Sequence, residues 1–196
     1  ESGDYQKGAG TLSKFLNEFP QSALATSALA KRGTMYQSKD VEDYPSALAD
    51  FTEIVESYPE AKEVEFAMQQ VALIHGHRRE LPKMVAAYEA LLAKFPNTPG
   101  AAEAYYWIGV GKFDSDQFKE TIEPLKKARE MADERFGAKA SLRIVLSYYQ
   151  LDDIVPLTAE TNAYLKRVEA AKADEKIEVP AEIPRQVLTH LGMKLF

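Results

Sequence analysis

The residues best suited to bind a metal ion are two of the three histidines, His75 and His77, in the stretch HGHRRE at 75–80. On a helix, side chains at positions i and i+2 point about 200° apart, so the two rings cannot hold one ion together. A third ligand of a suitable type is not spaced nearby, and we expect no metal site. We expect His75 to take the place of the packed tyrosine of other repeats. We expect His77, Arg78 and Arg79 to end the helix, because positive charge favours the C-terminal carbonyls.

Residue patterns that could support catalysis are missing. Acidic pairs such as Asp152 with Asp153, or Glu53 with Glu56, are interpreted as solvated charges on exposed faces or in turns. The sequence contains no glycine-rich phosphate loop and no serine, histidine and acid with the spacing of a nucleophile. It also contains no cysteine, which excludes disulfides, thiolate metal ligands and a cysteine nucleophile. We therefore predict a protein that is not an enzyme, with no catalytic residues and no cofactor.

The composition narrows the classes of partner. The chain has 196 residues, of which 45% are hydrophobic, and a net charge of −6. Nucleic-acid binding normally needs a concentrated basic face, so we do not expect it here. No apolar run approaches the roughly 20 residues that span a bilayer, so we expect no membrane insertion. Because Glu1 is not an initiator and VLTHLGMKLF stops within a helical pattern, we interpret the sequence as a piece of a longer protein.

One sixteen-residue pattern occurs twice, as YPSALADFTEIVESYP at 44–59 and, 37 residues later, as LPKMVAAYEALLAKFP at 81–96. Pro45 lies where a first helical turn tolerates proline, and Pro59 lies where a helix has to stop. Between them, apolar residues follow one helical stripe, and the intervening polar residues Asp50, Glu53, Glu56 and Ser57 are expected to face away. The stripe comprises Ala47, Leu48, Phe51, Ile54, Val55 and Tyr58.

Further copies extend the pattern over the chain. An earlier copy occupies 5–20, and weaker ones begin near 118 and 154. Each of the last four copies follows a helical segment with a small residue. We expect this residue to face a small residue of the second helix, so that the two backbones approach closely. A period of this size built from two helices predicts a solenoid, because stacked pairs bury the apolar face that one pair cannot bury alone. The small positions are Gly33, Ala72, Gly109 and Val145.

This pattern resembles the tetratricopeptide repeat family. The resemblance covers nearly the whole chain and implies an all-α, right-handed solenoid of stacked antiparallel helix pairs. The junctions NEFPQSALATSALAKRGTMY and KFPNTPGAAEAYYWIGVGKF are similar to those of a periplasmic branch linked to outer-membrane assembly and the Tol system, which implies a periplasmic location. A cytoplasmic location stays open. The matching residues are Gly33, Tyr36, Tyr44, Ala47, Phe51 and Pro59, followed by Ala72, Tyr88 and Pro96.

The copies divide the chain into one predicted array. The last full unit is expected to be degenerate, because it lacks a small residue at the place of Ala47. Leu191 and Gly192 are expected to take the places of Arg32 and Gly33 in a truncated final unit. The predicted ranges are 1–20 for the second helix of a leading repeat, 21–60, 61–97 and 98–134 for repeats, 135–172 for the degenerate repeat, 173–184 for a loop and 185–196 for a final first helix.

The resemblance implies that the first helices line a concave groove. Lysine, arginine and asparagine that grip a terminal carboxylate in some members are missing from these places, so we do not expect a chaperone-tail clamp. In the aromatic cluster we expect Tyr105 and Ile108 in the core, and Tyr106, Trp107 and Phe113 at contacts. The groove either binds an amphipathic helix or extended segment of a partner, or is buried against the protein itself. The predicted partner-binding residues are Phe66, Gln69, Leu73, Tyr106, Val110, Phe113, Leu142, Leu146 and Tyr149.

The function predicted from these features is a non-enzymatic protein–protein interaction scaffold that binds a protein or peptide partner in the groove. Self-association through the groove or through open repeat ends is a second possibility for the same surfaces. The alternative function is an accessory structural subunit of a bacterial envelope assembly or transport complex.

Overall fold

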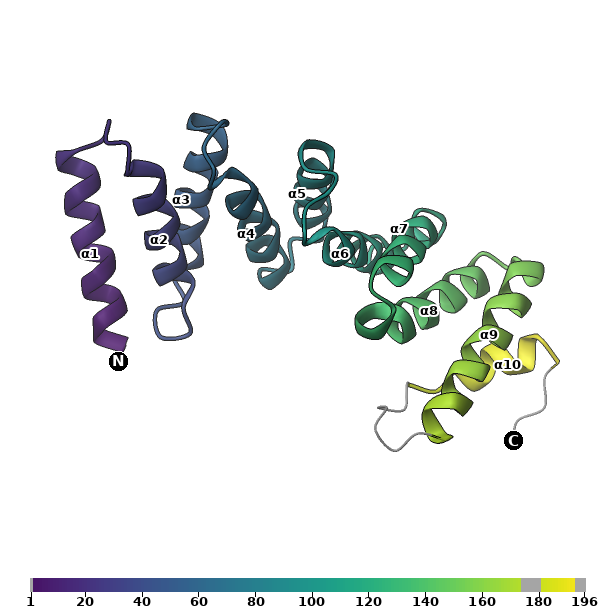
Figure 1. Cartoon of the computed structure of the whole chain (residues 1–196). Coiled ribbons are helices and arrows are strands. Elements are labelled where there is room, and N and C mark those ends of the chain that lie inside the picture. Colours follow the sequence, from purple (N-terminus) through teal and green to yellow (C-terminus); the bar gives the residue numbers. More distant parts are fainter. Residues whose placement is uncertain (1, 174–180, 193–196) are drawn as a thin grey trace. The chain divides into compact units, whose positions relative to one another are not determined.

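The computed structural model describes residues 2–173 and 181–192, and within these ranges the chain forms helices and no strands. Tertiary contacts divide the chain into two units, residues 1–98 and 99–196, each of which is described by itself (Figure 1). The division falls at a junction between predicted repeats, and the single array stays a prediction. No described helix combines the length and apolar character that crossing a membrane requires.

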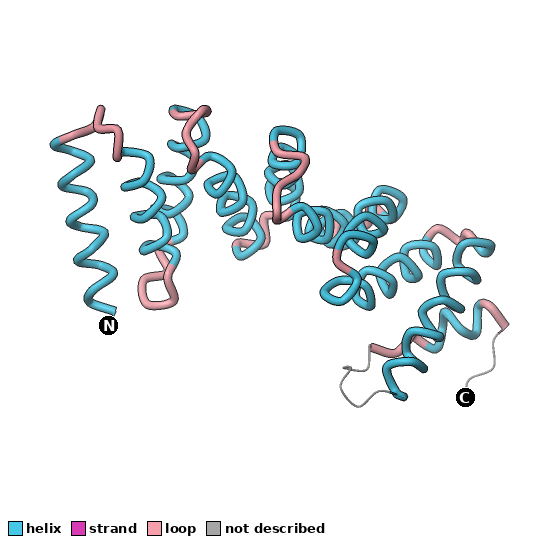
Figure 2. Tube along the Cα trace, viewed as in Figure 1, coloured by secondary structure: helices cyan, strands magenta, loops and turns pink. Residues whose placement is uncertain are grey.

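Unit 1 contains five helices, each packed against the next along the chain. Consecutive helices run antiparallel and are joined by short loops (Figure 2). The pairs α2/α3 and α4/α5 follow a lone α1. The helices are α1 (Ser2–Glu18), α2 (Ala25–Gln37), α3 (Tyr44–Ser57), α4 (Val64–His77) and α5 (Leu81–Lys94).

Unit 2 repeats the arrangement with two more helix pairs, α6/α7 and α8/α9. Successive helices pack together, and the first helices α6 and α8 also contact each other directly. The all-α fold of stacked helix pairs is thus as predicted. The described helices are α6 (Ala101–Phe113), α7 (Phe118–Met131), α8 (Asp133–Gln150), α9 (Ile154–Ala173) and α10 (Arg185–His190).

The helix ends follow the local sequence. At the start of α3, the Asp43 carboxylate accepts a hydrogen bond from the Ser46 backbone N–H at 3.1 Å, which satisfies one of the free N–H groups of the first turn. Pro45 lies in that first turn, and α3 ends at Ser57, two residues before Pro59. The prolines therefore bound the helix as predicted.

On α2 and α6, the small residue of the first helix faces a large residue of the second helix, which corrects the expectation that small faces small. A Cβ atom on Gly33 would lie 2.8 Å from Cζ of Phe51, and one on Gly109 would lie 2.5 Å from Cγ of Leu125. Phe51 and Leu125 occupy the same place in their repeats and are fully buried. The missing side chain thus makes room for the stripe residue of the next helix.

Asp50 is buried, at 3% exposure, although the sequence pattern placed it facing away. Arg32 of α2 donates to it twice, from Nε to Oδ2 at 2.9 Å and from Nη2 to Oδ1 at 2.6 Å. Arg32 also donates to Ser13 Oγ of α1 at 3.0 Å, and its hydrogen bonds to Asp50 raise the pKa of the guanidinium. The carboxylate faces inward because a cation from the neighbouring helix meets it there.

A second arginine joins three helices in unit 2. Arg129 of α7 donates to Glu160 of α9 at 2.8 Å and to Ser141 of α8 at 3.1 Å. Both arginines therefore link three helices that follow one another along the chain.

The end of the chain departs from the predicted repeat. The helix α10 ends at His190, and Gly192 has a φ of +64°, a left-handed conformation, with open space where a Cβ atom would lie. Gly192 is thus not the equivalent of Gly33, because it turns the chain and makes no helix crossing. Ile183 and Val187 are buried in the core of unit 2. Of the predicted loop at 173–184, residues 174–180 lie outside the described residues, as do 193–196 of the predicted final helix.

Candidate protein-docking surfaces

The two helical histidines make local contacts. His75 Nδ1 lies 2.7 Å from Glu80 Oε2, and this hydrogen bond holds the pKa of Glu80 below its usual value. The ring of His77 stacks on Tyr44 with centroids 5.6 Å apart. Among the described residues, no group of three or more histidine or acidic side chains is arranged to hold a metal ion.

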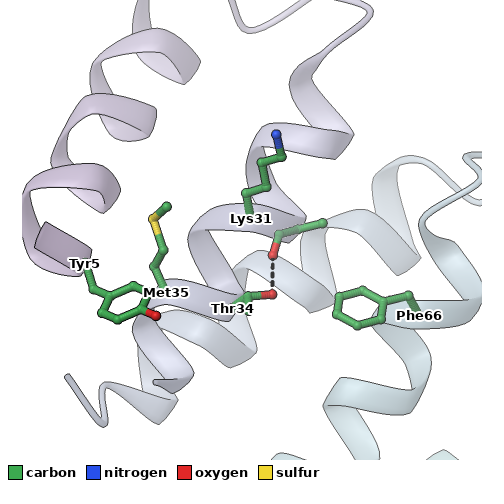
Figure 3. A pocket seen from close by; sticks show the side chains of 6 residues that line it. Tyr5, Lys31, Thr34, Met35 and Phe66 are labelled. Atoms are coloured by element: carbon green, nitrogen blue, oxygen red, sulfur yellow. Dashed lines mark hydrogen bonds between the residues drawn. The ribbon is translucent and has the colours of Figure 1, made fainter. Parts of the chain in front are cut away.

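Unit 1 carries a groove of about 380 Å³ between α1, α2 and α4. Figure 3 shows Tyr5 and Met35 on one side of Thr34 and Phe66 on the other, with Lys31 at the rim. Apart from Lys31 and Thr34, the lining is apolar or aromatic, and the Thr34 hydroxyl already donates to the Ala30 carbonyl at 2.8 Å. The groove is therefore suited to apolar side chains of a ligand. Its lining residues are Tyr5, Ala30, Lys31, Thr34, Met35 and Phe66.

The helices hold this groove in place through the core beneath it. Phe66 packs edge-on against the buried ring of Phe51, with centroids 5.7 Å apart, yet 41% of Phe66 stays exposed. On the other side, a Cβ atom on Gly8 would lie 3.0 Å from Met35 Sδ, so the backbone of α1 comes close to α2. Tyr5, one turn earlier on α1, is 44% exposed. The exposed rings thus stand on fixed, well-packed helices.

That Phe66, Gln69 and Leu73 bind a partner stays a prediction, and the structure gives their positions. Phe66 lines the groove, and Gln69 and Leu73 are half-buried on the same helix without lining it. Tyr5 and Met35 were missed, because the family pattern considers only one face of the first helices. The sequence feature that could have indicated Tyr5 and Met35 is Gly8, because a residue without a side chain lets α1 approach α2 closely.

In α6, the structure reverses the predicted roles of the two tyrosines. Tyr106, expected at a contact surface, is buried at 6% and stacks on Phe136 at a centroid distance of 4.6 Å. Tyr105, expected in the core, is half-buried, with Lys127 Nζ 4.8 Å from its ring centroid. The two charged residues of α6, Glu103 and Lys112, lie on opposite sides of the helix, so the sequence offers no single polar face from which to set the helix rotation.

The other residues predicted in α6 divide between core and edge. Val110 is also buried at 6%, which corrects its predicted place in an open groove, whereas Ile108 is buried at 3% as expected. Phe113 is half-buried and packs edge-on against Phe118 at 5.5 Å. Trp107 is half-buried at the edge of the same core. The first helix of unit 2 therefore offers little free apolar surface.

The open face of α8 holds the remaining predicted residues. Leu142, Leu146 and Tyr149 are half-buried and pack at the edge of the unit 2 core. At 100° per residue, Lys139 and Arg143 lie on this same face. The apolar positions were predicted, but Arg143 was missed because it falls one position beside the family's groove register. We call these five residues the α8 face.

Comparisons with known proteins place the fold. No protein-family model matches the chain, and no curated protein sequence matches it. Among solved structures, one of the MamA protein is similar, with a TM-score of 0.69, 18% sequence identity and coverage of 91% of this chain and 90% of that one. MamA 41-end from Desulfovibrio magneticus RS-1 gives a TM-score of 0.66 at 17% identity, covering 88% and 89% of the two chains. BtubC (BKLC) from P. vanneervenii gives 0.62 at 14% identity, covering 93% and 80%.

These similarities support a helical repeat fold of the tetratricopeptide type. At this level of identity they concern the fold alone. They do not extend to the periplasmic branch suggested by the junction sequences.

Proposed function

We propose that this protein is a non-enzymatic scaffold that binds a segment of a partner protein in the apolar groove of unit 1. The observation that carries the proposal is the exposure of Phe66 and Tyr5 on either side of that groove. The Phe66 ring is 41% exposed and packs against the buried Phe51 ring, so it loses little conformational entropy on binding. Large aromatic side chains of this kind contribute much of the binding energy in many protein interfaces.

The lining of the groove supports a protein ligand over a small polar one. It offers few free hydrogen-bonding groups, because the Thr34 hydroxyl is engaged within its own helix. Lys31 at the rim could pair with a carboxylate beside an apolar anchor. An amphipathic helix or extended segment matches these features.

Affinity purification from the native host tests the proposal. We expect wild-type protein to retain a partner, identified by mass spectrometry, that Phe66→Ser loses. Phe19→Ser is the matched control, because Phe19 is an aromatic residue outside the groove and, at 55%, is more exposed than Phe66 at 41%. Equal retention by Phe66→Ser and wild type would contradict the groove. Light scattering on the purified protein separates self-association from capture of a different chain.

A role as an accessory subunit of a bacterial envelope complex is the finer alternative, resting on the junction sequences alone. Cell fractionation tests it: recovery of the native protein in the periplasmic fraction supports this role, and recovery only in the cytoplasm refutes it.

A further inference from the structure

We propose that the α8 face of unit 2, made of Lys139, Leu142, Arg143, Leu146 and Tyr149, binds an acidic segment of a partner protein. This inference rests on the proposed scaffold function, but it concerns a different surface from the unit 1 groove and specifies the chemistry of the partner.

The charge of Arg143 is not balanced by a carboxylate of the described residues. Four arginines in the described part of the chain are half-buried, and three of them pair with carboxylates: Arg32 with Asp50, Arg129 with Glu160 and Arg167 with Asp133. Arg143 instead donates from Nη1 to the Tyr106 hydroxyl at 3.1 Å. A hydroxyl accepts a hydrogen bond but does not neutralise a charge, so Arg143 keeps its capacity to pair with an anion.

Contacts with Tyr106 hold Arg143 in place. Its Cζ lies 5.8 Å from the centroid of the Tyr106 ring, which is fixed in turn by stacking on Phe136. A guanidinium positioned before binding loses less side-chain entropy when it meets a carboxylate. The preorganised cation therefore favours a specific contact over a diffuse attraction.

Lys139 provides a second cation on the same face. It is exposed and, within the described ranges, forms no ion pair, whereas the nearby Arg135 is already paired with Glu103 at 2.9 Å. Four residues of α-helix separate Lys139 and Arg143 by about 6 Å along the axis, and alternate residues of an extended chain are about 6.6 Å apart. Two carboxylates two residues apart in an extended segment therefore match the two cations.

The apolar neighbours define the rest of the ligand. Leu142 and Leu146 lie one turn apart on the same face, and Tyr149 follows next to His190, with ring centroids 5.3 Å apart. A segment in which acidic residues are accompanied by apolar ones would satisfy both the charges and the half-buried leucines. Because the chain is acidic overall, with a net charge of −6, the α8 face is a local exception that would orient such a segment.

Fluorescence anisotropy with a blocked, labelled peptide of alternating glutamate and leucine tests this proposal. We expect wild-type protein to bind with a dissociation constant below about 100 µM at low salt. Binding should weaken several-fold as sodium chloride rises to about 300 mM, because partly exposed ion pairs are screened. A peptide with glutamine in place of each glutamate should bind at least about tenfold more weakly.

Variants then locate the site. Lys139→Glu should weaken binding about fivefold, and Lys139→Glu with Arg143→Met about 20-fold, since methionine keeps an apolar contact with Tyr106. Lys166→Glu, an equal charge change at an exposed position of α9, is the control and should bind like wild type. Circular dichroism confirms that each variant is folded.

Several results would overturn the proposal: no measurable peptide binding, equal binding of the glutamine peptide, or equal effects of Lys139→Glu and Lys166→Glu. Binding of a single-stranded oligonucleotide in place of the peptide, with the same dependence on Lys139, would also overturn it. If Phe66→Ser abolishes peptide binding, the peptide binds in unit 1. That result would contradict the proposal for the α8 face but not the proposed groove. Failure of partner capture in unit 1 with intact peptide binding would contradict the groove and leave the α8 face standing.

Discussion

The two units share one interior but present different open surfaces. In both, a glycine on the first helix receives a large stripe residue of the next helix, Phe51 against Gly33 and Leu125 against Gly109. The groove of unit 1 is lined mainly by apolar residues and has one lysine. The α8 face of unit 2 carries, beside two leucines, an arginine and a lysine that pair with no carboxylate of the described residues. The helix crossings are thus alike in the two units, whereas the residues on the open surfaces differ in charge.

Each unit also contains an arginine that hydrogen-bonds to two other helices, which we call an arginine bridge. Arg32 lies on a first helix and Arg129 on a second helix, yet each hydrogen-bonds to a serine on a neighbouring helix and to a carboxylate on a third helix. The bridge is thus a property of three stacked helices and can be built from either kind of helix.

The largest expected effect is a difference in stability between variants of an aromatic residue in each unit. Tyr106→Ser removes a stacked, buried ring and should lower the free energy of unfolding by about 3–5 kcal/mol. Phe66→Ser removes a ring that is 41% exposed, and should cost about 1 kcal/mol. Urea unfolding followed by circular dichroism measures both. Equal losses would show that the two rings do not differ in structural role.

Removing the acid of the unit 1 bridge should have the next largest effect. Asp50→Ala leaves the Arg32 guanidinium half-buried without its carboxylate, and should lower the free energy of unfolding by about 2–4 kcal/mol. The double variant Asp50→Ala with Arg32→Met removes the uncompensated charge and should recover part of that loss. If the double variant is as unstable as the sum of the single variants, the pairing of Arg32 with Asp50 does not stabilise the fold.

Alanine at glycine positions tests the shared crossing. Gly33→Ala forces the Phe51 ring to shift and should destabilise unit 1 by about 1–2 kcal/mol. Gly10→Ala is the matched control, since a Cβ atom there meets nothing within 4 Å, and it should stabilise α1 by up to about 1 kcal/mol through helix propensity. If the melting temperatures of both variants shift in the same direction, the proposed close contact between Gly33 and Phe51 would be contradicted.

The smallest expected effect concerns a surface pair of unit 2. Arg167 donates to Asp133 at 2.8 and 2.9 Å, and these hydrogen bonds hold the pKa of Asp133 below its usual value. The pair therefore stabilises above the unfolded pKa of about 3.9, and the gain is lost as the pH falls through the lower folded pKa. Because Asp133 is 55% exposed, Asp133→Asn should cost only about 0.5 kcal/mol at pH 7.

Urea unfolding at neutral and at acidic pH checks this prediction. The difference between wild type and Asp133→Asn should shrink as the pH falls below the folded pKa. Glu134→Gln, at the next and exposed position, serves as the control for charge at the start of α8. A difference that grows in acid would contradict the assignment.

The sequence predicted the helix pairs because their signals are local. Prolines, helical spacing and the small residues at 33 and 109 specify helix ends and crossings without knowledge of the neighbours. Val145 and Ala72 are likewise buried on their first helices.

The errors arose where a neighbouring helix decides the environment. The sequence pattern places Asp50 on the surface, because it does not show that Arg32 of the neighbouring helix pairs with it. A helix without a single polar face, such as α6, does not reveal that Tyr106 faces inward. Gly192 follows the repeat spacing, but the chain turns there. Arg143 stands out only when the partners of every other half-buried arginine are known.

Site-specific photo-crosslinking in the native host tests the scaffold function most directly. A benzoyl-phenylalanine in place of Lys31, at the rim of the unit 1 groove, is compared with one in place of Glu53, on the exposed face of α3. We predict one discrete protein adduct from position 31, absent from position 53 and abolished by adding Phe66→Ser. Identical adducts from both positions, or an adduct at position 31 that persists with Phe66→Ser, would contradict the proposed docking groove.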